Sequence, residues 1–123
     1  MEKCLYKDLT YNIIGRAIDV HKELGPGFLE KVYENAMLVA LKEVELSVEN
    51  QKQLNVKYHG VTVGDYFADL IVEDNVIIEL KAIKSLCDEH RAQIINYLTA
   101  TGMQVGLLIN FGAKSLEYER FVN

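Results

Sequence analysis

Apolar residues in the first third of the chain recur at spacings of three and four positions, which is the pattern of amphipathic helices. The first such stretch runs from Leu9 to Leu24, and the sequence Gly25-Pro26-Gly27 ends it. The second stretch begins after Gly27 and ends near Leu46. The pattern therefore predicts two helices, each with one buried side. On the buried side of the second helix we expect Leu29, Val32, Tyr33, Ala36, Met37, Ala40, Leu41 and Val44.

The period changes to two from Val48 onward, where apolar and polar residues alternate as they do in half-buried strands. Two runs rich in isoleucine, valine and leucine follow, Tyr66 to Val72 and Val76 to Ala82, and the polar loop Glu73-Asp74-Asn75 separates them. Such a loop is typical of a hairpin, and Asn75 suits the left-handed conformation that the loop requires. The second run is mostly apolar on both faces, so we expect it in the centre of a sheet.

The last third of the chain predicts a helix between two strands. Ser85 can cap a helix that runs to Thr101, and Val105 to Phe111 is typical of a buried strand. The helical crossover places that strand parallel to the preceding one, and Leu116 to Val122 could add an edge strand. The predicted fold class is α/β, with a mixed β-sheet flanked by helices. The predicted order is α-α-β-β-β-α-β with a possible terminal strand, in a single domain over residues 1–123.

Composition narrows the class of protein further. Half of the 123 residues are hydrophobic, which is ordinary for a globular domain. The longest apolar runs are far shorter than the ~20 residues of a membrane span, and the N-terminus has no signal pattern. We therefore expect no membrane association and a cytoplasmic location. Cys4 and Cys87 have neither disulfide nor metal-ligand spacing, so both are expected as reduced thiols.

The formal charge of −5 counts against a broad affinity for nucleic acid. Neutralising many phosphates needs clustered lysine and arginine, which this chain does not concentrate anywhere. A bound divalent metal would offset part of the negative charge, but only locally. An extended basic track for DNA is therefore not expected.

Candidate chemistry begins with Glu79-Leu80-Lys81, the one acidic-x-Lys triplet in the chain. Side chains two positions apart on a strand point the same way, so the two charges share a face. The loop Glu73-Asp74-Asn75 pairs the flanking valines and so puts Asp69 directly opposite Glu79, with Cβ atoms ~5 Å apart. Two carboxylates this close repel each other unless a cation or a proton lies between them.

Such a carboxylate pair suits Mg²⁺ or Mn²⁺, which accept one or two protein carboxylates and keep several waters. The metal would polarise a phosphoryl oxygen and lower the pKa of a bound water, while Lys81 would position that water or stabilise the transition state. A different register stays open: a two-residue loop would oppose Asp69 to Leu80 and destroy the site. In a separate alternative, Glu79 and Lys81 are a plain ion pair on a strand, worth ~0–1 kcal/mol, and the cluster has no function.

Glu30 is the second unusual carboxylate, because it falls within the apolar arc of its predicted helix. It is a candidate member of the active site. Alternatively, Gly27 is the N-cap and Glu30 is the N3 residue, where a negative charge stabilises the helix dipole. On the third predicted helix, Gln93 and Tyr97 lie one turn apart, on a side that could face the sheet.

The motif Gly-x-x-Glu-x-x-Tyr occurs at Gly27 to Tyr33, and the chain resembles the GxxExxY protein family in this motif and its flanks. The resemblance continues nearly to the end of the chain, through Phe67 to Leu70, Val76 to Ala82 and Val105 to Phe111. That family is grouped with the PD-(D/E)XK nuclease superfamily. The resemblance therefore implies a restriction-endonuclease-like core.

The resemblance also implies a role for each residue that it matches. Ala68 stands where the superfamily name has proline, which puts the local shape of the strand in doubt more than its chemistry. By position, Asp69 and Glu79 would be metal ligands, Lys81 the catalytic lysine, Glu30 the helix carboxylate and Gln93 the polar residue of the following helix.

The expected function is a metal-dependent nuclease that hydrolyses phosphodiester bonds in DNA or RNA with Mg²⁺, for which Mn²⁺ would substitute. Ends, flaps and short single strands suit it as substrates, because the small acidic domain has no evident surface for a long duplex. A homodimer could enlarge that surface. The alternative is a non-catalytic interaction module on a nuclease-like scaffold.

Overall fold

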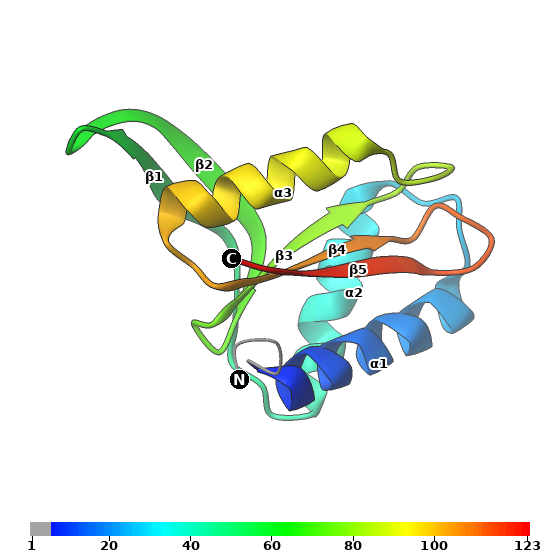
Figure 1. Cartoon of the computed structure of the whole chain (residues 1–123). Helices are drawn as coiled ribbons and strands as arrows, with labels where there is room; N and C mark the ends of the chain where they lie inside the picture. Colours follow the sequence, from blue (N-terminus) through cyan, green and yellow to red (C-terminus); the bar gives the residue numbers. More distant parts are fainter. Residues whose placement is uncertain (1–5) are drawn as a thin grey trace.

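The computed structural model describes residues 6–123 and forms one five-stranded sheet with helices on both faces (Figure 1). The predicted order of elements is confirmed, and the terminal strand is present. No helix in residues 6–123 is long and apolar enough to cross a bilayer. The elements are α1 (Lys7–Leu24), α2 (Glu30–Glu43), β1 (Val48–Tyr58), β2 (Val61–Val72), β3 (Val76–Lys81), α3 (Asp88–Thr101), β4 (Val105–Asn110) and β5 (Glu117–Val122).

The strands lie in the order in which the chain makes them, β1-β2-β3-β4-β5. Three of the pairings are antiparallel, whereas β3 and β4 are parallel because α3 carries the chain back across the sheet. The expected central position of β3 is confirmed, since its residues from Val76 to Leu80 are all buried. The sheet is therefore mixed, as the sequence predicted.

Two apolar clusters cover the two faces of the sheet. The larger cluster joins α1 and α2 to the strands, and the smaller one lies under α3. Figure 1 shows α3 on one side of the sheet, with α1 and α2 on the other. In the larger cluster, the ring of Tyr33 stacks on Phe111 with the ring centroids 4.6 Å apart. This contact anchors α2 to the end of β4.

The alternation of side chains between the two faces of the sheet is interrupted in β2 at Asp69. Leu70 belongs to the cluster of α1 and α2, whereas Tyr66 and Ala68 belong to the cluster of α3. Residues two apart on a regular strand would share a face, so the strand must be irregular between Ala68 and Leu70. The opposing residue of β1, Gln51, has a φ of 50° and is missing from the β1–β2 ladder. The irregularity therefore coincides with a candidate site residue.

Two local predictions about helix α2 are wrong. The helix begins at Glu30 with Leu29 as its N-cap, so Glu30 is the first helical residue and not the N3 residue of a cap at Gly27. The expected buried side is also rotated: Leu29 and Val32 are exposed, because Tyr33, Met37 and Leu41 turn toward the sheet together with Glu34. Contacts with distant strands decide this rotation.

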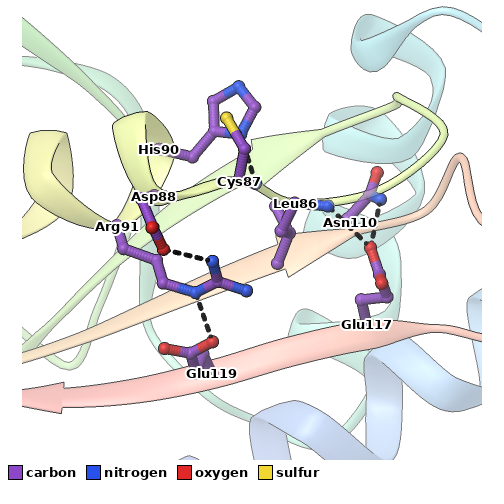
Figure 2. Close-up of polar contacts among 8 residues, drawn as sticks. All are labelled: Leu86, Cys87, Asp88, His90, Arg91, Asn110, Glu117 and Glu119. Atoms are coloured by element: carbon purple, nitrogen blue, oxygen red, sulfur yellow. Dashed lines mark hydrogen bonds and ion pairs between the residues drawn. The ribbon is translucent and has the colours of Figure 1, made fainter.

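The start of α3 and the β2–β3 loop also differ from expectation. The N-cap of α3 is Cys87 and not Ser85, and the backbone N–H of Cys87 donates to His90 Nδ1 (3.2 Å, Figure 2). Cys87 is a free, exposed thiol, as expected, whereas Cys4 lies outside the described residues. In the loop, the left-handed residues are Glu73 and Asp74, with φ of 53° and 57°, and not Asn75.

The segment that leaves β3 is fixed by one buried amide, the side chain of Asn110. Its Oδ1 accepts hydrogen bonds from the backbone N–H of Ile83 and of Gly112, both at 3.0 Å. Its Nδ2 donates to Ile83 O, and it also donates to Glu117 Oε1, which is the bond drawn in Figure 2. Because these bonds hold the chain just beyond Lys81, they also fix the end of the strand that carries the candidate lysine.

Replacing Gly112 by alanine is expected to lower the free energy of unfolding by ~2–3 kcal/mol. A Cβ at this position would lie 2.3 Å from the backbone nitrogen of Ile83 and 2.5 Å from the carbonyl carbon of Ala82, so the backbone would have to move. Denaturation in urea measures the loss. Gly15→Ala is the matched control, because a Cβ there meets nothing within 4 Å and alanine favours α1 by up to ~1 kcal/mol. Equal stability of the Gly112 variant and the wild type would contradict the predicted clash.

Candidate active site

The hairpin register that the candidate site requires is confirmed. Val72 pairs with Val76, and the ladder continues to Leu70 and Ile78. It ends there, one position before Asp69 and Glu79. Continuing the same register places these two carboxylates opposite each other, at the point where β2 and β3 separate.

Where the ladder ends, backbone N–H groups donate to side-chain carboxylates of the neighbouring strand. The backbone N–H of Leu80 donates to Asp69 Oδ2 at 2.8 Å, and the backbone N–H of Asp69 donates to Glu79 Oε2 at 3.4 Å. Each strand thus supplies an amide to the carboxylate of the other. Both carboxylates are held between the strands and cannot turn away to solvent without losing these bonds.

Glu79 is the more buried carboxylate, with 8% of the residue exposed. The hydroxyl of Tyr66 donates a hydrogen bond to its Oε2. Burial raises the pKa of Glu79 to about 7, and the nearby charge of Asp69 raises it too, against the smaller effects of Tyr66 and Lys81. Burial and the charge of Glu79 also raise the pKa of the Tyr66 hydroxyl, so this hydroxyl stays protonated and remains a donor.

Asp69 carries a pKa above its ordinary value, mainly because it is buried. Gln51 Nε2 donates to its Oδ1 at 3.3 Å, and this bond and the charge of Lys81 act in the opposite direction. Lys81 lowers the pKa of Glu79 as well. One lysine is therefore close enough to stabilise the charge on both carboxylates.

A third carboxylate, Glu34 of α2, approaches this pair, and the sequence analysis did not identify it. Glu34 is 5% exposed, and its Oε1 accepts a hydrogen bond of 2.8 Å from Gln51 Nε2. The same nitrogen donates to Asp69, so one amide bridges the helix carboxylate and the strand carboxylate. Burial raises the pKa of Glu34, but hydrogen bonds from Lys31, Asn50 and Gln51 together bring it below the ordinary value.

The structure does not bring Glu30 into this cluster. Glu30 is exposed at the start of α2, one turn before Glu34, and it makes no hydrogen bond or ion pair within residues 6–123. The N-terminal end of a helix favours a carboxylate there by itself. The one signal in the sequence for Glu34 is that it lies four positions beyond Glu30, on the same side of the helix. No pattern in the sequence indicated that Gln51 belongs to the site, because its position depends on strand pairing and on its left-handed backbone conformation.

Gln93 reaches the cluster indirectly. It is exposed on α3 and shares a side-chain hydrogen bond with Tyr97. The ring of Tyr97 stacks on that of Tyr66, with the centroids 3.5 Å apart, and Tyr66 in turn donates to Glu79. A line of polar and aromatic contacts therefore runs from α3 to the buried carboxylate.

A cavity of about 380 Å³ opens next to Lys81. Its wall is polar, so it suits a hydrated or charged ligand better than an apolar one. The cavity is lined by Lys81, Cys87, Glu89, His90 and Gln93. Lys81 thus borders both the carboxylate pair and an open space that a substrate could enter.

The donor set fits a hard divalent cation. Within residues 6–123, no group of three or more histidine, cysteine, aspartate and glutamate side chains is placed to hold a metal. Asp69 and Glu79 are a pair, and Mg²⁺ needs only one or two carboxylates because waters and substrate oxygens complete its shell. The pKa of both groups is raised mainly by burial and further by neighbouring carboxylates, and a bound cation would favour their ionised forms.

The free energy of unfolding of the metal-free protein is expected to fall as the pH rises from about 5 to 8. The pKa of Glu79 is about 7 in the fold against 4.5 as its ordinary value, so the folded state binds an extra proton between these values. The stabilisation is complete below pH 4.5 and is lost as the pH passes 7, an effect of about 3 kcal/mol. Urea denaturation in the presence of a chelator measures it.

Glu79→Gln is the control for this pH dependence, because glutamine still accepts the bond from Tyr66 but does not titrate. The variant is expected to flatten the profile between pH 5 and 8. A wild-type profile that rises with pH over this interval would contradict the assigned pKa of Glu79.

A comparison with protein families identifies the chain. The model of the PD-(D/E)XK nuclease superfamily matches residues 7–121, from the first residue of α1 to β5. No curated protein and no solved structure matched the chain in the searches made against each. The match spans nearly the whole chain, and the mixed five-stranded sheet with its helices agrees with a restriction-endonuclease-like fold. The chain belongs to the PD-(D/E)XK nuclease superfamily.

Proposed function

We propose that the protein is a divalent-metal-dependent nuclease that hydrolyses phosphodiester bonds in DNA or RNA. One observation carries the proposal: Asp69 and Glu79 stand together where two central strands separate, each bonded to the backbone of the other strand. Lys81 lies on the same strand as Glu79 and borders an open cavity. Two carboxylates and a lysine at this spacing are the groups that metal-assisted hydrolysis needs.

Asp69 and Glu79 would hold the metal, which we expect to be Mg²⁺ with Mn²⁺ as a substitute. When bound, the cation would polarise a phosphoryl oxygen and lower the pKa of a coordinated water. Its charge would also favour the ionised form of Glu79, whose pKa is about 7 without it.

Lys81 would act on the substrate side of the carboxylates. Its ammonium group would orient the attacking water or stabilise negative charge on the phosphoryl group in the transition state. The protonated Tyr66 hydroxyl fixes one oxygen of Glu79, and Gln51 fixes one oxygen of Asp69. These two donors would keep the carboxylates in one orientation while a substrate binds.

Glu34 would be the helix carboxylate of the site, because it shares the amide of Gln51 with Asp69. Glu30 and Gln93 are exposed, so we propose that they contact the substrate at the margin of the site. Ends, flaps and short single strands remain the proposed substrates, since the chain has a net charge of −5 and no basic track. Within the superfamily, we propose that the chain falls in the GxxExxY family on the motif at Gly27 to Tyr33.

Mn²⁺ binding measured by calorimetry tests the proposal without a choice of substrate. The wild type is expected to bind one equivalent, whereas Asp69→Ala and Glu79→Ala are expected to lose binding because each removes a ligand. Lys81→Ala should retain the metal but lose cleavage of a mixed panel of single-stranded and flap substrates by at least about 100-fold.

Circular dichroism on each variant separates loss of the site from loss of the fold. The experiment is repeated with a non-cleavable phosphorothioate oligonucleotide, so that a site completed by substrate phosphate is also detected. If the wild type binds no metal under either condition, the nuclease proposal is wrong and the non-catalytic interaction module replaces it.

A pair of matched variants on α2 separates the two helix carboxylates. Glu34→Gln is expected to reduce kcat by about 10- to 100-fold, because it removes the negative charge of the helix carboxylate and leaves only a neutral acceptor for the amide of Gln51 that also bonds to Asp69. Glu30→Gln, one turn away on the same helix, is expected to change KM more than kcat, because an exposed side chain at the margin contacts only the substrate. A larger loss of kcat in the Glu30 variant would reverse the assignment.

A further inference from the structure

Helix α2 carries an apolar stripe on its outward side that the fold leaves largely exposed. Val32, Ala36 and Val39 follow Leu29 at spacings of three and four positions, which is the seam pattern of a helix that packs on another helix. Leu29 is 81% exposed and Val39 is 59% exposed. The inward side of the same helix packs on the sheet through Tyr33. Of the stripe, Ala36 packs partly against the same core cluster, whereas Leu29, Val32 and Val39 are exposed.

The stripe borders a groove between α1 and α2 with a volume of about 330 Å³. The wall supplied by α2 consists of Ala36, Val39 and Ala40, and α1 adds Val20 and Leu24. Two of the three apolar residues from α2 are alanines, so large side chains from a partner have room to enter between the helices.

Acidic residues complete the lining of the groove. They are Asp19, Glu23 and Glu43, and the lining contains no lysine, arginine or histidine. Asp19 is paired with Arg16, with its Oδ2 2.9 Å from the guanidinium nitrogen. Within residues 6–123, Glu23 and Glu43 make no hydrogen bond or ion pair. The groove therefore offers two uncompensated carboxylates beside an apolar floor.

We infer that this groove binds an amphipathic helix of a partner protein, with apolar residues along its seam and lysine or arginine on its flanks. An apolar seam would cover the stripe, and basic flanks would pair with Glu23 and Glu43. Charge complementarity favours this occupant over a second copy of the chain. A two-fold symmetric contact through this face would bring the acidic rims of two copies against each other.

The groove and the candidate active site use opposite sides of α2. Glu34 faces β1 and Gln51, whereas Val39 and Glu43 face the groove. The two sites share no residue in the described part of the chain. Variants in the groove therefore test the docking site without altering the groups proposed for metal binding.

A displayed library of helical peptides of about 20 residues tests the inference on the full-length chain. Every peptide has apolar residues at positions i, i+3, i+7 and i+10, and the flanks are basic, acidic or neutral in three sublibraries. The basic sublibrary is expected to be enriched. For an enriched peptide, measured by fluorescence anisotropy, Val39→Ser is expected to weaken Kd about tenfold, and the double variant Glu23→Gln/Glu43→Gln about fivefold.

Matched controls lie on β2 and α3, outside the lining of the groove. Val63 of β2 is 61% exposed, close to the value of Val39, so Val63→Ser should leave the peptide Kd unchanged. Asp65→Asn/Glu89→Gln removes the same net charge as the groove double variant and should also have no effect. Three results would overturn the inference: no saturable binding in any sublibrary, enrichment of acidic peptides, or a dimer in sedimentation that Val39→Ser dissociates.

Discussion

The site depends on the way in which β2 and β3 stop pairing. Beyond Leu70 and Ile78, the backbone amides of the two strands no longer bond to carbonyl groups across the ladder. The amides of Asp69 and Leu80 bond instead to the carboxylates of Glu79 and Asp69. Buried amides need partners, so these acidic side chains are part of the sheet as well as part of the site. Their position is fixed by the same bonds that end the ladder.

This arrangement concentrates negative charge at a position where Glu79 is buried and Asp69 is partly buried. Burial raises the pKa of both Asp69 and Glu79, and their mutual repulsion adds to the effect on Glu79. Interactions with Tyr66, Gln51 and Lys81 lower these pKa values, but they offset only part of the increase. Perturbed carboxylates in an open site are a common feature of catalytic centres, where a substrate, proton or cation supplies the missing partner. The superfamily match covers both strands that carry these residues.

Helix α2 contributes acidic side chains both to the candidate site and to the groove between α1 and α2. Its inward side carries Glu34, which joins the candidate site through Gln51, and its outward side carries the apolar stripe with Glu43 at the end. Three acidic residues collect at the candidate site, and three line the α1–α2 groove. The first collection suits a small cation, whereas the second lies beside apolar side chains and suits a basic polypeptide.

The sequence by itself determined the order of elements and the register that opposes Asp69 to Glu79, because side-chain periodicity and loop length are local properties. The rotation of α2 was decided only by tertiary structure, since Tyr33 stacks on Phe111, a residue that directly follows the distant strand β4. That rotation buries Glu34, leaves Glu30 at the surface and exposes the apolar stripe. Periodicity gives the width of an apolar face but not the neighbour on which that face packs. The sequence alone therefore could not show which of Glu30 and Glu34 is the carboxylate that lies at the candidate site.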